Sequence, residues 1–374
     1  MRQIHTPHGD LALPAFLPDA TRAVVRGVDA QDLEAAGVPG VVVNAFHLGL
    51  NPGSKAVAAL GGIHAMMGWS RPVVSDSGGF QVFSLIRSGQ VRGSITKKGV
   101  HYATPSGRQA EWLTPEKSIQ TQLRLGADVL VCLDDCTHPD DPPEEQAASV
   151  ERTIGWARRC KEEFERGLAM SRNTLPKVPN LREGGEDRLK AGLQTQNRPL
   201  LFGVIQGGND PKLRRECAAA LVEMSFDGYG FGGWPFDSQR RLLAEILALT
   251  AGLMPPDKPK YALGIGSPAN LVACARMGYN LFDCALPTRD ARQGRLYVFR
   301  STSATDLGHG RIYLQDERHR RAGGPVSEFC DCHACRNHSL AYLHHLFTIR
   351  DGLAARLATI HNLRFYTQLI ERLR

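Results

Sequence analysis

The chain has 374 residues, of which 42% are hydrophobic and 22% are charged. This composition is typical of a globular protein, and no apolar run is long enough to span a bilayer, which excludes a membrane-spanning chain. The N-terminal residues also lack an apolar signal region, so we expect a cytoplasmic protein. The length exceeds what one ordinary core needs, but it fits an α/β barrel with an appended piece.

The net charge of +7 is concentrated near the C-terminus, where residues 285–374 contain 14 Arg, no Lys and 8 Asp or Glu. Arginine suits bidentate contacts to phosphate, so this region predicts a nucleic-acid partner, although a solvated basic surface would have the same composition. The nine Cys are an odd number in a chain without a signal peptide. This favours metal binding or reduced thiols over a disulfide framework.

Short apolar runs bounded by Gly, Pro or Asp recur along the chain, with helix-like segments between them. The runs are Pro14–Leu17, Val41–Asn44, Val73–Val74, Val129–Leu133, Leu201–Ile205, Tyr229–Phe231, Tyr261–Leu263 and Leu281–Phe282. The clearest helical segments are Asp29–Ala36, Pro115–Leu125 and Leu213–Met224. Apolar runs of this kind suit strands buried on both faces, so eight strand–helix units predict a (β/α)8 barrel. A doubly wound open sheet is the alternative, but no Gly-x-Gly-x-x-Gly fingerprint follows the first strand.

Two segments interrupt the alternation of strands and helices. Gly89–Gly107 is rich in Gly, Ser and Thr and lies between the third and fourth strands, where it predicts a small hairpin or a lid. Glu165–Arg198 is polar, contains Pro and Gly, and has no clear period. We expect this second segment to be a long, mobile insertion.

Polar residues follow most of the predicted strands. They are Asn44, His47, Asp76, Asp134, Asp135, Cys136, Gln206, Gly207, Gly232, Gly233, Gly264 and Asp283. In a barrel these positions share the C-terminal rim, where active sites lie. Each Asp alone would read as a cap or a turn residue, but acids from three strands that converge on one rim predict a catalytic site.

The segment from Val73 to Gln81 has the residues expected of a pocket for a flat heterocycle. Asp76 ends the strand, two glycines let the backbone turn, and Phe80 and Gln81 follow. The acid suits proton chemistry, the aromatic ring suits stacking and the amide suits hydrogen bonding. An ordinary strand-to-loop turn with an Asp cap is the alternative for this segment taken alone.

Cys330, Cys332 and Cys335 are close enough in sequence to wrap one ion. A structural zinc site needs four N or S ligands, so a fourth ligand is missing. The candidates are His333, His338, His344, His345 and His361. His333 is placed too tightly, and residues 339–347 and 353–369 read as helices, so a His on the second helix could return to the thiols. Spacing favours His361 only slightly over His344 or His345, and a thiol cluster without metal is the alternative.

Several motifs, in register along nearly the whole chain, resemble the tRNA-guanine transglycosylases. They are Ser75–Gln81, Leu133–Cys136, Gln206–Gly207, Gly232–Gly233, Phe282–Arg289, and Cys330-x-Cys-x-x-Cys335 with His361. The resemblance implies a (β/α)8 barrel with a zinc-bearing insertion near the C-terminus, and it favours His361 as the fourth ligand of a structural Zn²⁺. We therefore expect a catalytic barrel over residues 1–300 and a zinc-binding, helical region over residues 301–374.

That family exchanges guanine at the wobble position of certain tRNAs for a 7-deazaguanine, in the queuosine pathway. The resemblance implies that Asp283 attacks C1′ of the ribose to give a covalent ribosyl-enzyme, and that Asp76 is the general acid/base. It assigns Thr288, Arg289 and Arg292 to the anticodon loop of the tRNA, and it suggests a homodimer. The substrate-binding residues would be Ser77, Phe80, Gln81, Asp134, Cys136, Gln206, Gly232, Gly233, Trp234 and Leu263.

The chain departs from the bacterial pattern of that family near the predicted pocket. Trp234 stands where Leu usually follows the glycine pair, and Phe236 lies close behind it, so the pocket beside the 7-substituent should be reshaped. Asp290 stands where many bacterial members carry Asn, and this acid could weaken a phosphate contact of Arg289. We rank 7-aminomethyl-7-deazaguanine first as the incoming base, and queuine or 7-cyano-7-deazaguanine behind it.

Two other functions remain open from the sequence. One is a catalytically silent RNA-binding partner subunit, but a silent copy has no reason to retain Asp76 and Asp283. The other is a relative that modifies DNA, against which Pro287–Arg289 matches the segment that grips tRNA.

Overall fold

The computed structural model describes residues 3–103, 110–138, 140–174, 198–301, 303 and 306–374. Its centre is an eight-stranded parallel sheet whose strands follow the order β3-β13-β12-β11-β10-β9-β5-β4. The strands are β3 Ala15–Pro18, β4 Val41–Asn44, β5 Val73–Asp76, β9 Val129–Val131, β10 Leu200–Ile205, β11 Gly228–Phe231, β12 Lys260–Ala262 and β13 Leu281–Cys284. A parallel bridge between Asp19 and Val42 joins the two edges. The predicted barrel is therefore confirmed, and all eight apolar runs contribute a strand.

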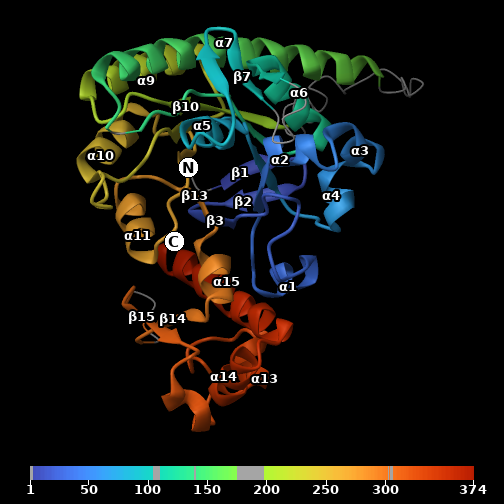
Figure 1. Ribbon diagram of the computed structural model, residues 1–374, viewed down its shortest axis with the longest axis vertical. Coiled ribbons are helices and arrows are strands. Elements are labelled where there is room, and N and C mark those ends of the chain that lie inside the picture. Colours follow the sequence, from blue (N-terminus) through green and yellow to red (C-terminus); the bar gives the residue numbers. More distant parts are fainter. Residues whose placement is uncertain (1–2, 104–109, 139, 175–197, 302, 304–305) are drawn as a thin grey trace, which may run out of the picture.

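Helices cover the outside of the barrel (Figure 1). They are α1 Ala30–Ala35, α2 Ala45–Leu50, α3 Ser54–Ala59, α4 Gly62–Met67, α5 Gly79–Arg87, α6 Pro115–Leu125, α7 Pro143–Thr174, α9 Pro211–Met224, α10 Ala244–Leu253, α11 Pro268–Arg276 and α12 Leu286–Arg292. Helix α6 illustrates why the N-termini of these helices can be predicted from the sequence. The Thr114 side chain accepts a hydrogen bond from Lys117 N, and Pro115 occupies the first turn, where no N–H is needed.

Two apolar cores lie on either side of the strands. The larger core lies between the strands and the surrounding helices, and the smaller one fills the barrel with Leu17, Val74 and Val129 among others. Because both faces of each strand are buried, the strands read as unbroken apolar runs rather than as alternating patterns.

A short hairpin of β1, Gln3–Thr6, and β2, Gly9–Ala12, covers the N-terminal end of the barrel. Its Ile4 and Leu11 pack with the interior residues of the barrel. The sequence pattern does not predict this hairpin, since each strand is short and has few apolar residues from which a period could be read.

The first predicted insertion contains a three-stranded antiparallel sheet of β6 Gly93–Thr96, β7 Gly99–Ala103 and β8 Ala110–Leu113. The expected hairpin is thus present and gains a third strand. The prediction of an irregular insertion from Glu165 is wrong for residues 165–174, because α7 continues through Thr174. Helix α7 packs against α6 and α9. This tertiary packing stabilises the helix even though the segment has only a weak helical period in its sequence. Residues 175–197 lie outside the described residues.

The chain after the last barrel strand forms a separate lobe at the lower end of Figure 1 and then returns to the barrel. The lobe contains β14 Arg295–Phe299, β15 His309–Tyr313, the 3-10 turn η1 Glu317–Arg321, α13 His333–Asn337 and α14 Leu340–Thr348. The long final helix α15, Gly352–Leu373, packs on α12, α11, α1 and β3. Its Thr367 hydroxyl donates to Ala36 O at 2.8 Å. The C-terminal helix therefore belongs to both the lobe and the outer layer of the barrel.

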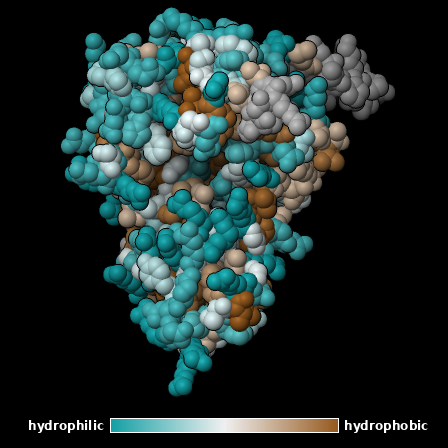
Figure 2. Space-filling model, in the orientation of Figure 1, coloured by the Kyte–Doolittle hydropathy of each residue, from teal (hydrophilic) through white to brown (hydrophobic). Residues whose placement is uncertain are grey.

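The visible face of this lobe is mostly hydrophilic apart from a small apolar patch, and further apolar patches appear on the upper half of the molecule (Figure 2). None of the helices in the described part of the chain combines the length and the apolar character needed to cross a bilayer.

Candidate active site

A cavity of about 360 Å³ opens at the C-terminal ends of the barrel strands. Its wall contains Val42, Asp76, Ser77, Gly78, Phe80, Gln81, Val131, Asp134, Cys136, Val204, Phe231, Gly232, Gly233, Trp234, Pro235, Phe236, Tyr261, Leu263, Gly264 and Asp283. The structure therefore brings the two predicted catalytic acids and all but one of the predicted substrate-binding residues to one cavity. The exception, Gln206, is fully buried and donates a hydrogen bond to Asp134 in the wall.

Asp76 is held by three donors at the end of β5. Asn44 Nδ2 donates to Asp76 Oδ2 at 2.7 Å, and the backbone N–H groups of Ala45 and Gly78 each donate to Oδ1 at 3.2 Å. These donors lower the pKa of the carboxyl, but burial outweighs them and raises it to about 7. A proton on Asp76 is therefore exchangeable near neutral pH.

Asn44 and Gly78 fix the position of that acid. Asn44 lies beside Asp76 on the neighbouring strand and caps α2, since its side-chain oxygen accepts from His47 N at 3.0 Å. The cap leaves Nδ2 pointing at the acid. Gly78 has a φ of +79°, and a Cβ there would lie 2.7 Å from Phe46 Cβ, so only glycine fits this turn. Sequence reasoning placed Asn44 on the rim but gave it no role.

Asp283 ends β13 and accepts a single backbone hydrogen bond, from Gly264 N to Oδ1 at 2.8 Å. Burial raises the pKa of Asp283 to about 6. The negative charge of Asp283 in turn contributes to the raised pKa of Asp76, because the two carboxyl groups are close across the cavity. Tyr261 is fully buried next to Asp283, and burial there raises the pKa of its hydroxyl well above the ordinary value. Sequence reasoning did not identify Tyr261, which reads only as a strand residue.

Asp134 and Gln206 form a second polar pair in the wall. Gln206 Nε2 donates to Asp134 Oδ2 at 2.5 Å, while Gln206 Oε1 is buried without a partner among the described atoms. Burial raises the pKa of Asp134 to about 7, although the bond from Gln206 opposes the rise. A ligand N–H would satisfy Gln206 Oε1 or the other Asp134 oxygen, and the second hydrogen on Gln206 Nε2 is left to donate to a ligand C=O.

Aromatic rings form one edge of the cavity mouth. The Phe80 and Trp234 ring centroids are 5.6 Å apart, and the His138 ring centroid lies 5.5 Å from that of Trp234. Phe80 is 45% exposed and Trp234 is 41% exposed, so both rings are available to a ligand. Phe236, which lines the cavity behind Trp234, adds to this apolar edge.

The predicted RNA-binding segment lies on α12, directly after β13. Arg289 is exposed, and Arg292 is half-buried with one guanidinium nitrogen, Nη1, unpartnered among the described atoms. Thr288 is buried instead, and its hydroxyl donates to Ala285 O at 3.2 Å, so it is not available at the surface. Of the three residues that the resemblance assigns to RNA binding, Arg289 and Arg292 are thus the two that reach the surface.

The prediction that the Asp290 carboxylate could weaken a phosphate contact of Arg289 is wrong. Asp290 is buried, and its carboxylate accepts a hydrogen bond from the Tyr297 hydroxyl at 2.5 Å. It points into the protein, toward β14, because helix geometry turns successive residues to different faces.

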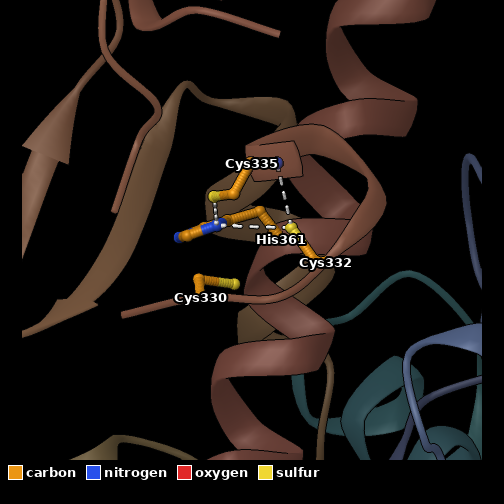
Figure 3. Close-up of side chains that lie close together, drawn as sticks. All are labelled: Cys330, Cys332, Cys335 and His361. Atoms are coloured by element: carbon orange, nitrogen blue, oxygen red, sulfur yellow. Dashed lines mark hydrogen bonds between the residues drawn. The ribbon is translucent and has the colours of Figure 1, made fainter. Parts of the chain in front are cut away.

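The C-terminal lobe holds a cluster of three thiols and one imidazole: Cys330, Cys332, Cys335 and His361 (Figure 3). Their ligand atoms all lie within 4.8 Å of one another, and His361 Nδ1 is 3.2 Å from Cys335 Sγ and 3.8 Å from Cys332 Sγ. His361 Nε2 is 2.8 Å from Tyr297 O, a contact that leaves Nδ1 free to bind a metal. The donors thus fit a closed structural metal site.

The other histidine candidates lie elsewhere. His344 is buried, and its Nδ1 is 2.7 Å from Leu314 O, while His345 is exposed. The structure therefore resolves the choice that spacing left open in favour of His361. It does so because α15 runs back past the thiols and brings His361 to them.

A second group of possible ligands, at the opposite end of the barrel, has a structural explanation. Both oxygens of the buried Asp128 accept backbone N–H groups, from His8 at 3.0 Å and from Val73 at 2.8 Å. The rings of His8 and His64 are stacked 3.5 Å apart beside this carboxylate. Parallel rings direct their lone pairs side by side rather than toward one point, so we assign the group to holding the N-terminal hairpin in place.

Comparison with known proteins agrees with the fold and the residues at these sites. A sequence model described as "Queuine tRNA-ribosyltransferase" matches residues 1–374. A queuine tRNA-ribosyltransferase of Shewanella denitrificans strain OS217 is 38% identical over 366 residues, which cover 98% of this chain and 86% of that protein. One from Shewanella sp. strain W3-18-1 is 39% identical over 366 residues, which cover 98% of this chain and 87% of that protein.

Proposed function

The chain belongs to the queuine tRNA-ribosyltransferase family and is therefore a pentosyltransferase. We propose that it exchanges guanine at the wobble position of tRNA for a 7-deazaguanine. The observation that carries this proposal is the shared cavity of Asp76, Asp134 and Asp283 at the strand ends. Two acids with pKa values near neutrality, beside a polar pair that suits a purine edge, match a reaction in which a base leaves and another enters.

The reaction is a double displacement at C1′ of the ribose. Asp283 attacks C1′, its carboxylate oxygen forms an ester bond, and the C1′–N9 bond to guanine breaks as Asp76 delivers a proton to the departing base. The incoming base then attacks C1′, the bond to Asp283 breaks, and Asp76 takes the proton from the ring nitrogen. Two inversions restore the original configuration, as in a retaining glycosidase.

The cavity wall also accounts for recognition of the base. Asp134 accepts from the N–H groups of the purine edge, and Gln206 and the Gly233 N–H donate to its carbonyl oxygen. Phe80 and Leu263 cover the two faces of the ring, while Ser77, Gln81 and Cys136 support the pocket. Arg289 and Arg292 contact the phosphates of the anticodon loop, from which the target base must be extruded.

We expect the chain, incubated with undermodified tRNA, to incorporate one of the three candidate bases, as read by mass spectrometry of the nucleosides. Incorporation of 7-aminomethyl-7-deazaguanine ahead of queuine and the 7-cyano base would support the proposed order. Tight tRNA binding without any incorporation would favour a silent RNA-binding subunit, and incorporation into DNA but not tRNA would favour a DNA-modifying enzyme.

The activity should have a bell-shaped dependence on pH. Asp283, with a pKa of about 6, and Asp134, with a pKa of about 7, must be ionised, so kcat/KM should fall as the pH drops below these values. Asp76, with a pKa of about 7, must be protonated when guanine leaves, so kcat/KM for tRNA should also fall above neutrality. Initial rates from pH 5 to 9 test this, and a flat profile would contradict it.

The same raised pKa values affect folding in a defined direction. The folded protein holds these protons more tightly than the unfolded chain, in which the carboxyl groups titrate near 3.8. Their contribution to stability is therefore full at low pH and is lost as the pH rises through about 7. The Asp134→Asn variant should lose activity yet lose less stability than the wild-type protein between pH 5 and pH 8.

Trp234 should limit the size of the 7-substituent. We expect Trp234→Leu to raise kcat/KM for queuine relative to 7-aminomethyl-7-deazaguanine by about tenfold or more, because it removes a ring from the cavity edge. Guanine has no 7-substituent, so its exchange rate is the internal control and should change little. An unchanged ratio of the two deazaguanines would show that Trp234 lies outside the path of the substituent.

We further propose that the cluster of Cys330, Cys332, Cys335 and His361 binds a structural Zn²⁺. Three thiolates and one imidazole nitrogen are a preferred zinc donor set, and they leave no open position for catalysis. By the same family relationship we propose a homodimer.

A further inference from the structure

Arg214, on α9, is an unusual side chain for the interior of a protein. It is only 1% exposed, and no carboxylate in the described part of the chain pairs with it. Burial lowers the pKa of its guanidinium to about 10, so the group still carries a positive charge at neutral pH. Burying a charge without a counter-ion costs folding free energy. The hydrogen bonds and ring contacts of Arg214 must therefore compensate for that cost.

Those contacts join the ends of two adjacent barrel strands. Arg214 Nη1 donates to Ile205 O at 2.6 Å and Nε donates to Gly208 O at 3.0 Å. The guanidinium also stacks on the Phe231 ring, with Cζ 4.1 Å from the centroid. Ile205 O accepts a second bond, from Gly232 N at 2.9 Å. One side chain thus binds the end of β10 and the turn that follows it, and packs on the last residue of β11.

The turns after β10 and β11 carry the groups that are proposed to read the base. Gln206 lies between the two carbonyl groups that Arg214 binds, and Gly233 follows Phe231 and Gly232. A Cβ on Gly233 would lie 3.5 Å from Arg214 Nη2, and one on Gly207, whose φ is +138°, would lie 2.7 Å from Arg214 N. The helix and its guanidinium are therefore packed directly behind the backbone of both turns.

From this geometry we infer that Arg214 is a positioning residue, which holds Gln206 and the Gly233 N–H in the arrangement that recognises the carbonyl group of the purine. The inference rests on the proposed function for the identity of the ligand. Its structural part, that Arg214 orders the two turns, holds for any ligand of the cavity. Gly208 lies beyond the last residue of β10, so its carbonyl group needs a donor that a hydrophobic side chain could not supply.

The chain offers a matched control for this inference. Arg215, the next residue on α9, is exposed, so Arg215→Met removes the same charge from the same helix without touching the turns. In hydrogen–deuterium exchange, Arg214→Met should speed the exchange of residues 206–208 and 232–234 about tenfold or more, while strands β10 and β11 remain protected. Arg215→Met should leave both segments as in the wild-type protein. Unchanged exchange of both segments in a folded Arg214→Met protein would overturn the inference.

A second readout separates positioning from a general loss of stability. The KM for guanine should rise about tenfold or more in Arg214→Met, with the KM for tRNA within about twofold of the wild-type value. The preference for guanine over 2-aminopurine, which lacks the 6-carbonyl group, should fall by a similar factor. Arg214→Lys retains a donor and should recover part of both effects.

The outcomes of the two experiments are distinguishable. Faster exchange of the two turns with no guanine exchange even in the wild-type protein would support the role of Arg214 and reject the proposed function. Equal losses for guanine and 2-aminopurine in Arg214→Met would mean that the residue only stabilises the fold, and would overturn the inference.

Discussion

Asp283→Ala is expected to lower the rate of guanine exchange into tRNA by at least about 10⁴-fold, because the variant lacks the carboxylate that forms the bond to C1′. Gly264 N donates to Asp283 Oδ1 at 2.8 Å and orients the carboxylate toward the cavity that it lines. The wild-type protein incubated with an anticodon stem-loop should give a covalent adduct that survives denaturing electrophoresis. The variant should give none while still binding the RNA.

Two further variants sharpen this test. Asp283→Asn preserves the shape of the side chain and can still accept from Gly264 N, so its loss of activity would report on the nucleophile rather than on packing. Asp257→Ala removes an exposed acid that lies before β12, outside the cavity, and should retain full activity. Normal exchange or adduct formation by Asp283→Ala would end the assignment of this residue as the nucleophile.

Loss of the metal site should have the largest effect on stability. We expect Cys335→Ser, or removal of zinc with a chelator, to lower the free energy of unfolding by more than about 4 kcal/mol. The effect should reach the barrel, since His361 lies on α15, the helix that also packs on α1, α11 and β3. Metal content per chain and the midpoint of thermal unfolding measure the two consequences together.

A second buried cysteine allows the effect of losing the metal to be distinguished from the effect of placing a Ser at a buried position. Cys274, on α11, is also a buried thiol, but it lies outside the cluster. Cys274→Ser should retain the bound metal and cost about 1–2 kcal/mol, the usual penalty for an imperfectly satisfied buried polar group. If Cys335→Ser retained one zinc per chain and unfolded at the same temperature as Cys274→Ser, the site would not be structural.

The local pattern of the sequence determined the barrel and much of the candidate site. The apolar runs are readable because strands buried on both faces need apolar side chains at every position. The acids at Asp76, Asp134 and Asp283 follow those runs directly, so the parallel arrangement of the strands was enough to place them on one rim. The resemblance to the tRNA-guanine transglycosylases, drawn from motifs in register, is confirmed by the family match over the whole chain.

The remaining features of the candidate site and the metal cluster depend on contacts between segments that are distant in the sequence. Local sequence patterns do not predict such contacts. Spacing could not choose among His344, His345 and His361, because the choice depends on how α15 returns to the thiols. Arg214 reads as one more basic helix residue until the fold buries it behind two turns that lie on separate strands. The burial of Asp290 and the hydrogen bond from Asn44 to Asp76 likewise depend on partners that only the tertiary structure brings into range.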